Sequence, residues 1–260
     1  MVKHIFLFFI FLWFSKFTAQ NRNIAVNYTE IISLGAPGAN LKVYNASLFI
    51  TKDKTLYVTK IDSLENGGKT ITKTYKDKSG KIKGIRDFST KKGIYNILDR
   101  ESDTLYSNAR FNYNFIYKEK RPKINWKIHS TEKLIENIKV RKATATFRGR
   151  NYIAWFAYEI PVSLGPWKLN GLPGLIIEAY DDKNEVQFLF KKLVLPYKYF
   201  PSIPSLDKNW VSYTAYLSEK KKHIERNLKY SRSLGQQFES QVSDDEIEGI
   251  KNVSFLEKND

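Results

Sequence analysis

The chain has 260 residues and no cysteine, and its 43 Lys and Arg against 27 Asp and Glu give a net charge of +16. A sequence without cysteine excludes disulfides, thiol nucleophiles, zinc thiolates and iron–sulfur clusters, and we expect no lipid anchor on an N-terminal cysteine. Aromatic residues make up 15% of the chain, enough to fill the core of a single β domain of this length.

The first 19 residues have the pattern of a cleavable secretory signal. Lys3 and His4 precede the apolar run 5–14, and the small residue Ala19 follows it. The run is shorter than the roughly 20 apolar residues that span a bilayer, and an uncleaved membrane helix is the alternative interpretation. Cleavage after Ala19 would remove two lysines and no acid, leaving a net charge of +14. We therefore predict export to the periplasm, the outer membrane or the medium.

The positive charge favours anionic partners such as lipid headgroups, acidic polysaccharide, nucleic acid or an acidic protein. The lysines are scattered rather than clustered with glycine and aromatic residues. That distribution is typical of a solubilising surface. We expect no nucleic acid partner, and a membrane surface stays a candidate partner through charge alone.

Between residues 24 and 127 the sequence alternates short β-type segments with turn signals. Residues 41–50 and 55–59 are rich in β-forming side chains. The turn signals are Asn66-Gly67-Gly68, Ser79-Gly80 and Lys92-Gly93. This spacing predicts an antiparallel meander.

Two hairpins follow the meander. Residues 139–147 and 151–158 flank Arg148-Gly149-Arg150, where Gly149 supplies the unusual backbone angles of a tight turn. The second hairpin joins 174–180 to 185–194. Residues 131–138, just before the first hairpin, fit either a single helical turn or a bend into the next strand.

The C-terminal part changes character after a connector that contains three prolines, Pro196, Pro201 and Pro204. Residues 208–241 are predicted to form a helix, because apolar side chains recur there at helical spacing. They are Trp210, Tyr213, Leu217, Ile224 and Leu228. We expect the acidic tail 243–260 to be weakly ordered.

These elements predict one domain over residues 20–242. Its fold class is mainly β (α+β): an antiparallel, strongly curved sheet or half-barrel with a long C-terminal helix packed on the open face of the sheet.

Residues 141–182 carry a long pattern of strands, prolines and glycines. It contains Phe147-Arg148-Gly149-Arg150, Ala154-Trp155-Phe156, Ile160-Pro161, Gly165-Pro166 and the hexapeptide Gly171-Leu172-Pro173-Gly174-Leu175-Ile176. This pattern resembles the GLPGLI family of exported Bacteroidota proteins, which are mostly of unknown function and in some cases encoded near TonB-dependent receptors. The resemblance implies an envelope protein. The pattern is also similar, more distantly, to the half-barrels that carry lipoproteins in the periplasm.

The composition of the hexapeptide region suits a structural role rather than catalysis, because the hexapeptide holds no acid, base or nucleophile. Prolines remove hydrogen-bond donors and fix φ, and glycines allow close backbone approach. We interpret the region as a rigid corner between the two hairpins. The residues assigned to it are Pro161, Gly165, Pro166, Gly171, Leu172, Pro173, Gly174, Leu175 and Ile176.

Polar and aromatic residues near this corner are candidate ligand-binding residues. Arg148 and Arg150 would share one face of an extended strand. The full set is Arg148, Arg150, Trp155, Glu159, Trp167, Lys168 and Asp181. The alternative is that the tryptophans belong to the core, that both arginines face solvent at a turn, and that Asp181 serves the hairpin turn.

The sequence offers little for catalysis. After the predicted signal, only His129 and His223 remain as histidines, and neither lies in a known nucleophile, zinc or phosphate-binding motif. We predict no catalytic residue, metal or cofactor, and favour a non-catalytic binding or accessory protein, with an envelope protein or a peptide, glycan or lipid as partner. One alternative is a hydrolase of peptides or glycans, which would need a cleft joining Glu159, Asp181 or His129 to a partner group. The other is a lipid or anionic-ligand carrier, which would need a large apolar cavity.

Two tripeptides look like the O-glycosylation acceptor used in Bacteroidota. They are Asp62-Ser63-Leu64 and Asp103-Thr104-Leu105, which make Ser63 and Thr104 the candidate acceptors.

Overall fold

The computed structural model describes residues 23–33, 41–65, 71–76, 82–87, 89–237 and 257. The predicted signal, the turns at 66–68 and 79–80, and most of the predicted tail lie outside the described residues.

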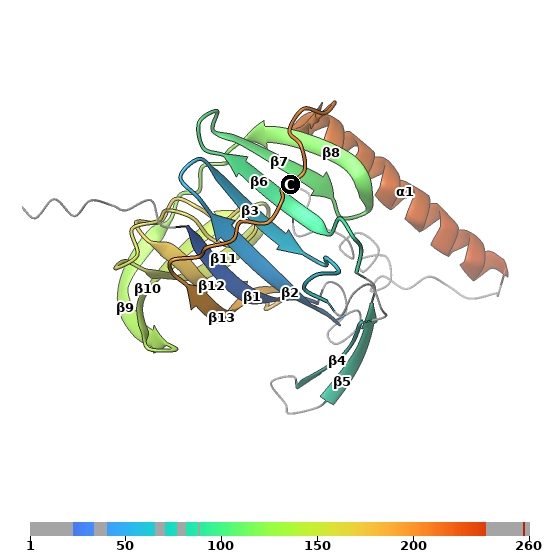
Figure 1. Ribbon diagram of the computed structural model, residues 1–260. Coiled ribbons are helices and arrows are strands. Elements are labelled where there is room, and N and C mark those ends of the chain that lie inside the picture. The colour runs from blue at the N-terminus through green and yellow to red at the C-terminus, as the bar shows by residue number, and fades with distance from the viewer. Residues whose placement is uncertain are drawn as a thin grey trace, which may run out of the picture.

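In the described residues the structure is mainly β, with one open sheet of twelve strands and one helix (Figure 1). The sheet order is β14-β8-β7-β6-β3-β2-β1-β13-β12-β11-β10-β9, and β4 and β5 form a separate two-stranded sheet. The strands are β1 (Ile24–Ser33), β2 (Leu41–Ile50), β3 (Lys54–Thr59), β4 (Ile71–Lys76), β5 (Ile82–Asp87), β6 (Ile94–Asp99), β7 (Thr104–Ala109), β8 (Asn112–Lys120), β9 (Lys127–Ile135), β10 (Ile138–Phe147), β11 (Arg150–Ala157), β12 (Leu175–Asp181), β13 (Val186–Val194) and β14 (Val211–Ser212).

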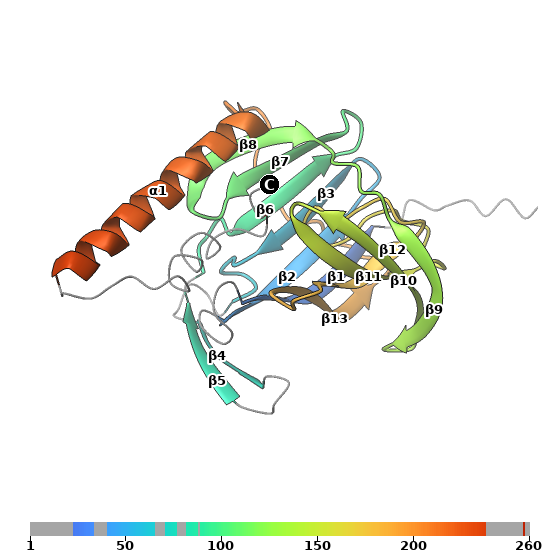
Figure 2. The ribbon, with the colours of Figure 1, turned by 180° about the vertical axis from the view of Figure 1, so that it is seen from behind.

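The first strand of the chain joins two groups of strands. β1 pairs antiparallel with β2 on one side and with β13 on the other, so it connects the group β2, β3, β6, β7 and β8 to the group β9–β13. The predicted mainly β fold is confirmed, and the sheet is visibly curved and unclosed when seen from both sides (Figures 1 and 2). One pairing departs from the antiparallel prediction, because the short β14 lies parallel to β8.

The hairpins β9–β10 and β10–β11 both close through tight turns. Arg148 and Gly149 have φ of 51° and 68°, and Phe147 pairs with Arg150, as in a two-residue turn with two positive φ values. Glu136 and Asn137, with φ of 44° and 65°, form the turn between β9 and β10. Residues 131–135 are therefore strand, and the helical-turn interpretation was wrong.

The two faces of the sheet are both covered. The inner face, defined here as the one that carries the main core with Tyr28, Phe156 and Phe188, is crossed by the connection from β11 to β12, residues 158–174, which we call the crossover loop. Its Trp167 stacks on Phe188 with ring centroids 6.5 Å apart, and its Leu172 is fully buried. The outer face carries a second core that includes Leu56 and packs against the proline-containing connector.

The helix α1 (Tyr213–Gln237) begins five residues later than predicted. Ser212 caps it, since its hydroxyl accepts a hydrogen bond from the Ala215 amide at 3.2 Å. Trp210 lies before the helix and donates from its indole Nε1 to the carbonyl of Leu206 at 2.8 Å. Residues 238–241 of the predicted helix lie outside the described residues.

The helix packs on β8 near one edge of the sheet (Figure 2). Among the helix side chains from Tyr213 to residue 233, the buried ones are Tyr216, Lys220 and Ile224, whereas Leu217 is 40% exposed. The predicted packing of a C-terminal helix on the sheet is confirmed, and Tyr216 of α1 stacks on Tyr117 of β8 with ring centroids 4.1 Å apart. Within the described residues, α1 included, no helix has the length and apolarity that crossing a bilayer requires.

Candidate binding sites

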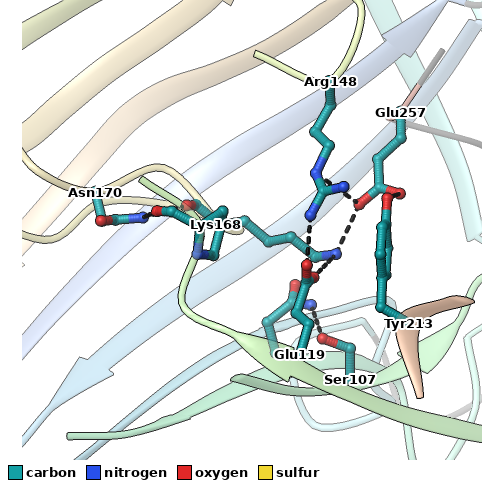
Figure 3. A network of polar contacts seen from close by, with 9 residues as sticks. Ser107, Glu119, Arg148, Lys168, Asn170, Tyr213 and Glu257 are labelled. Carbon is teal, nitrogen blue, oxygen red and sulfur yellow. Dashed lines mark hydrogen bonds and ion pairs between the residues drawn. The ribbon is translucent and has the colours of Figure 1, made fainter. Parts of the chain in front are cut away.

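A buried group of charges lies where the start of α1, β8 and the crossover loop meet (Figure 3). We call it the charge cluster and define it as Glu119, Arg148, Lys168, Tyr213 and Glu257. Glu119 lies on β8, Arg148 in the β10–β11 turn, Lys168 in the crossover loop and Tyr213 at the first residue of α1. The β10–β11 turn and the crossover loop hold their two cations toward the same point (Figure 3).

Two carboxylates share the cations of the charge cluster. Lys168 Nζ donates to Glu119 Oε1 and to Glu257 Oε1, each at 2.6 Å. Arg148 Nη2 donates to Glu119 Oε2, and the Tyr213 hydroxyl donates to Glu257 Oε2 at 2.8 Å. The Lys168 side chain is 0% exposed and that of Glu257 is 5% exposed, so these ion pairs are shielded from solvent.

Tyrosine rings line the cluster and add to its cation binding. The guanidinium carbon of Arg148 lies 4.1 Å from the ring centroid of Tyr213. Lys168 Nζ lies 5.1 Å from the ring of Tyr117, which in turn stacks on Tyr216 of α1 with centroids 4.1 Å apart. A cation over an aromatic face is stabilised by the ring quadrupole, more so when solvent is excluded.

The surroundings of Glu257 keep it ionised. Burial alone would raise the pKa of Glu257, but the charges of Lys168 and Arg148 outweigh burial and hold that pKa below its usual value. A lowered folded-state pKa contributes stability that is present above the unfolded-state pKa and is lost as the pH falls through the folded-state pKa. The docking of Glu257 is therefore complete at neutral pH and weakens only in acid.

The two arginines of the first hairpin do not share a face, contrary to the sequence prediction, because Arg148 lies in the turn and Arg150 in β11. Arg150 Nη1 donates to Asp181 Oδ2 at 2.6 Å and to Glu185 Oε2 at 2.7 Å, and its side chain is 0% exposed. Neither arginine is a solvent-facing turn residue. Asp181 also accepts from the Val186 amide at 3.0 Å, which matches its expected role in the second hairpin.

The other candidate ligand residues lie elsewhere. Trp155 is 8% exposed and its indole Nε1 donates to the Tyr180 hydroxyl at 3.3 Å, with Lys133 Nζ 4.3 Å from its ring. Glu159 is exposed. Of the predicted set, the structure therefore forms two groups: Arg148 and Lys168, with Trp167 beside Lys168 in the crossover loop, and Arg150 with Asp181. Sequence reasoning missed Glu119, Tyr213 and Glu257.

The residues named for a hydrolase contact different partners. His129 Nε2 lies 2.8 Å from the Thr144 hydroxyl and Asp181 pairs with Arg150; in the described part of the chain no hydrogen bond or ion pair joins either residue to Glu159. Across the described residues, no group of three or more His, Cys, Asp or Glu is arranged to hold a metal ion.

A second candidate site lies on the outer face, between the sheet and the proline-containing connector. We call it the apolar groove; its cavity volume is about 390 Å³. Its lining residues are Phe49, Leu56, Val58, Ile61, Ser63, Leu64, Lys91, Lys92, Tyr95, Pro201, Ser202, Ile203, Pro204 and Lys208. Most of them are apolar, and three lysines lie among them.

Both predicted glycosylation acceptors stay predictions. Ser63 is exposed and lines the apolar groove. Thr104 begins β7 and is partly exposed, and its hydroxyl donates to the Ser102 carbonyl at 3.1 Å.

Together these features define a cysteine-free open β-sheet protein with a buried charge cluster and an apolar groove. A family model described as a protein of unknown function, Porph_ging, matches residues 148–178. Those residues run from the β10–β11 turn through the crossover loop into β12. The sequence matches no curated protein.

Two solved structures of PNGF-II, in space groups P21 and C2, are similar to this chain at 15% and 16% identity, with TM-scores of 0.49 and 0.48. Each comparison covers 76% of this chain, which spans 32% of the PNGF-II chain.

Proposed function

We propose that the chain is an exported, non-catalytic binding protein of the cell envelope that carries an amphipathic anion, an alkyl chain with a carboxylate or similar head, in the apolar groove. The observation that carries this proposal is the groove itself, with apolar walls and lysines within one cavity of about 390 Å³. Binding sites for small ligands have volumes of about 300–1,000 Å³ and mostly apolar linings.

The walls of the groove suit an alkyl chain. Leu56 and Val58 of β3 and Tyr95 of β6 present buried apolar surface on one side, and Ile203 of the connector lies on the other. Burial of an alkyl chain contributes roughly 25 cal/mol for each Å² of apolar surface removed from water. Most of the affinity should therefore come from the chain of the ligand.

The lysines of the groove favour a ligand with a negatively charged head. Lys91, Lys92 and Lys208 are exposed, so their attraction for an anionic head is screened by salt. They should orient the head and discriminate against cations more than they add affinity. This arrangement is the reason for preferring an anion over a neutral or cationic lipid.

Membership of the GLPGLI family is part of the proposal, supported by the hexapeptide within the matched residues 148–178. Because some family members are encoded near TonB-dependent receptors, we further propose that the carrier works with an outer-membrane transport system.

The proposal predicts selective binding of an alkyl carboxylate. In calorimetric titrations dodecanoate should bind saturably, and dodecylammonium, which has the same chain and the opposite charge, should bind about tenfold more weakly at low salt. Ile203→Glu, which places a carboxylate in the wall of the groove, should abolish dodecanoate binding. Tyr199→Glu, on the same connector but outside the groove lining and 77% exposed, is the matched control and should bind normally. Equal binding by both variants would argue against the groove.

A further inference from the structure

Glu257 is held as a ligand would be, by groups from distant parts of the chain. Its carboxylate accepts from Lys168 of the crossover loop and from Tyr213 of α1. Its backbone carbonyl accepts from Lys220 Nζ at 2.9 Å, and Lys220 is itself 2% exposed. Recognition of a side-chain carboxylate together with the carbonyl of the same residue is recognition of a peptide residue rather than of a simple anion.

The groups around Glu257 form a site that needs a second anion. Without the Glu257 carboxylate, the cations of Lys168 and Arg148 would face Glu119 as the one carboxylate of the charge cluster. A buried cation without a matching anion is strongly unfavourable, and the penalty falls with a second carboxylate in place.

The site also offers more hydrogen-bond donors than Glu257 accepts. The buried Nε of Arg148 makes no hydrogen bond among the described residues and lies 4.0 Å from Glu257 Oε1, which is too far for one. A peptide carboxylate that sat slightly closer to Arg148 could engage Nε and Lys168 at once, because a guanidinium offers donors in a fixed fork.

We propose that Arg148, Lys168, Tyr213 and Lys220 form a binding site for an acidic residue of a peptide, and that Glu257 is its tethered occupant. A glutamate in an extended segment of a partner protein competes with Glu257 for this site. None of the four residues lines the apolar groove, so the inference stands independently of the proposed carrier function.

The test supplies the occupant from outside. A synthetic peptide with the sequence of residues 253–260, Val-Ser-Phe-Leu-Glu-Lys-Asn-Asp, is titrated into the full-length Glu257→Ala variant and into the unaltered chain, and binding is followed by fluorescence anisotropy. We expect saturable binding to the variant and binding weaker by about tenfold or more to the unaltered chain, because a tethered competitor has a high effective concentration. The control peptide, with Gln in place of the Glu257 equivalent, should not bind the variant.

Equal binding of both peptides to the variant, or equal binding of the Glu peptide to both proteins, would overturn the proposal. Near-ultraviolet circular dichroism covers the case in which Glu257→Ala does not fold by itself. The Glu peptide should then restore the spectrum of the folded protein and the Gln peptide should not, and no recovery with the Glu peptide would equally overturn the proposal.

Discussion

Lys168→Met is expected to lower the free energy of unfolding by about 3–5 kcal/mol, because removal of one partner leaves a buried charge uncompensated. Lys168 Nζ contacts both Glu119 and Glu257 at 2.6 Å from a fully buried position. Met keeps much of the shape of Lys but supplies neither the charge nor the hydrogen bonds. Glu119 would keep only Arg148 as its cationic partner within the charge cluster.

Urea unfolding measures this loss. The matched control is Lys222→Met on α1, whose lysine is 62% exposed and pairs with Glu219 at 3.7 Å, and exposed pairs of this kind contribute less than about 1 kcal/mol. Adding Glu119→Gln to Lys168→Met should recover part of the stability, since it removes one uncompensated carboxylate. A loss no greater than that of the control would mean that the charge cluster does not stabilise the fold.

Gly174→Ala is expected to destabilise the protein by about 3 kcal/mol, at the upper end of the usual range for overpacking. A Cβ on Gly174 would lie 2.3 Å from the carbonyl oxygen of Ala157 and 2.9 Å from Cα of Tyr158. Both are backbone atoms at the end of β11, so no side-chain rotation relieves the overlap. A shift of this segment would also disturb the hydrogen bond from the Leu175 amide to the Ile160 carbonyl, which is 3.0 Å long.

Gly171→Ala is the matched control from the same hexapeptide. Its nearest neighbour is 3.8 Å away, so space is free, but its φ of +95° disfavours any side chain. We expect a smaller loss, about 1–2 kcal/mol. Thermal or urea unfolding of both variants distinguishes the two causes, and a Gly174→Ala loss equal to or below that of Gly171→Ala would contradict the close-approach argument.

Local patterns predicted much of the fold. β-forming segments and turn residues predicted the meander, and Gly149 marked the first hairpin turn, because strand alternation and positive φ are properties of neighbouring residues. The late start of α1 and its place on β8 could not be predicted. The place of α1 depends on contacts that are distant in sequence, such as the stacking of Tyr216 on Tyr117 of β8.

The same dependence on contacts distant in sequence explains why the charge cluster was predicted only in part. The sequence pointed to Arg148 and Lys168, because they lie near the predicted corner, but not to their meeting with Glu119. Lys168 and Glu257 are 89 residues apart, and Glu257 belongs to the tail that was expected to be weakly ordered. The one available signal was the apolar pair Phe255-Leu256 directly before Glu257.

The most direct test of the proposed carrier function is a crystal structure of the protein grown with dodecanoate. The account predicts an alkyl chain in the apolar groove between Leu56 and Ile203, with its carboxylate toward Lys91, Lys92 or Lys208. An empty groove with dodecanoate bound elsewhere, or no bound dodecanoate at a saturating concentration, would contradict it.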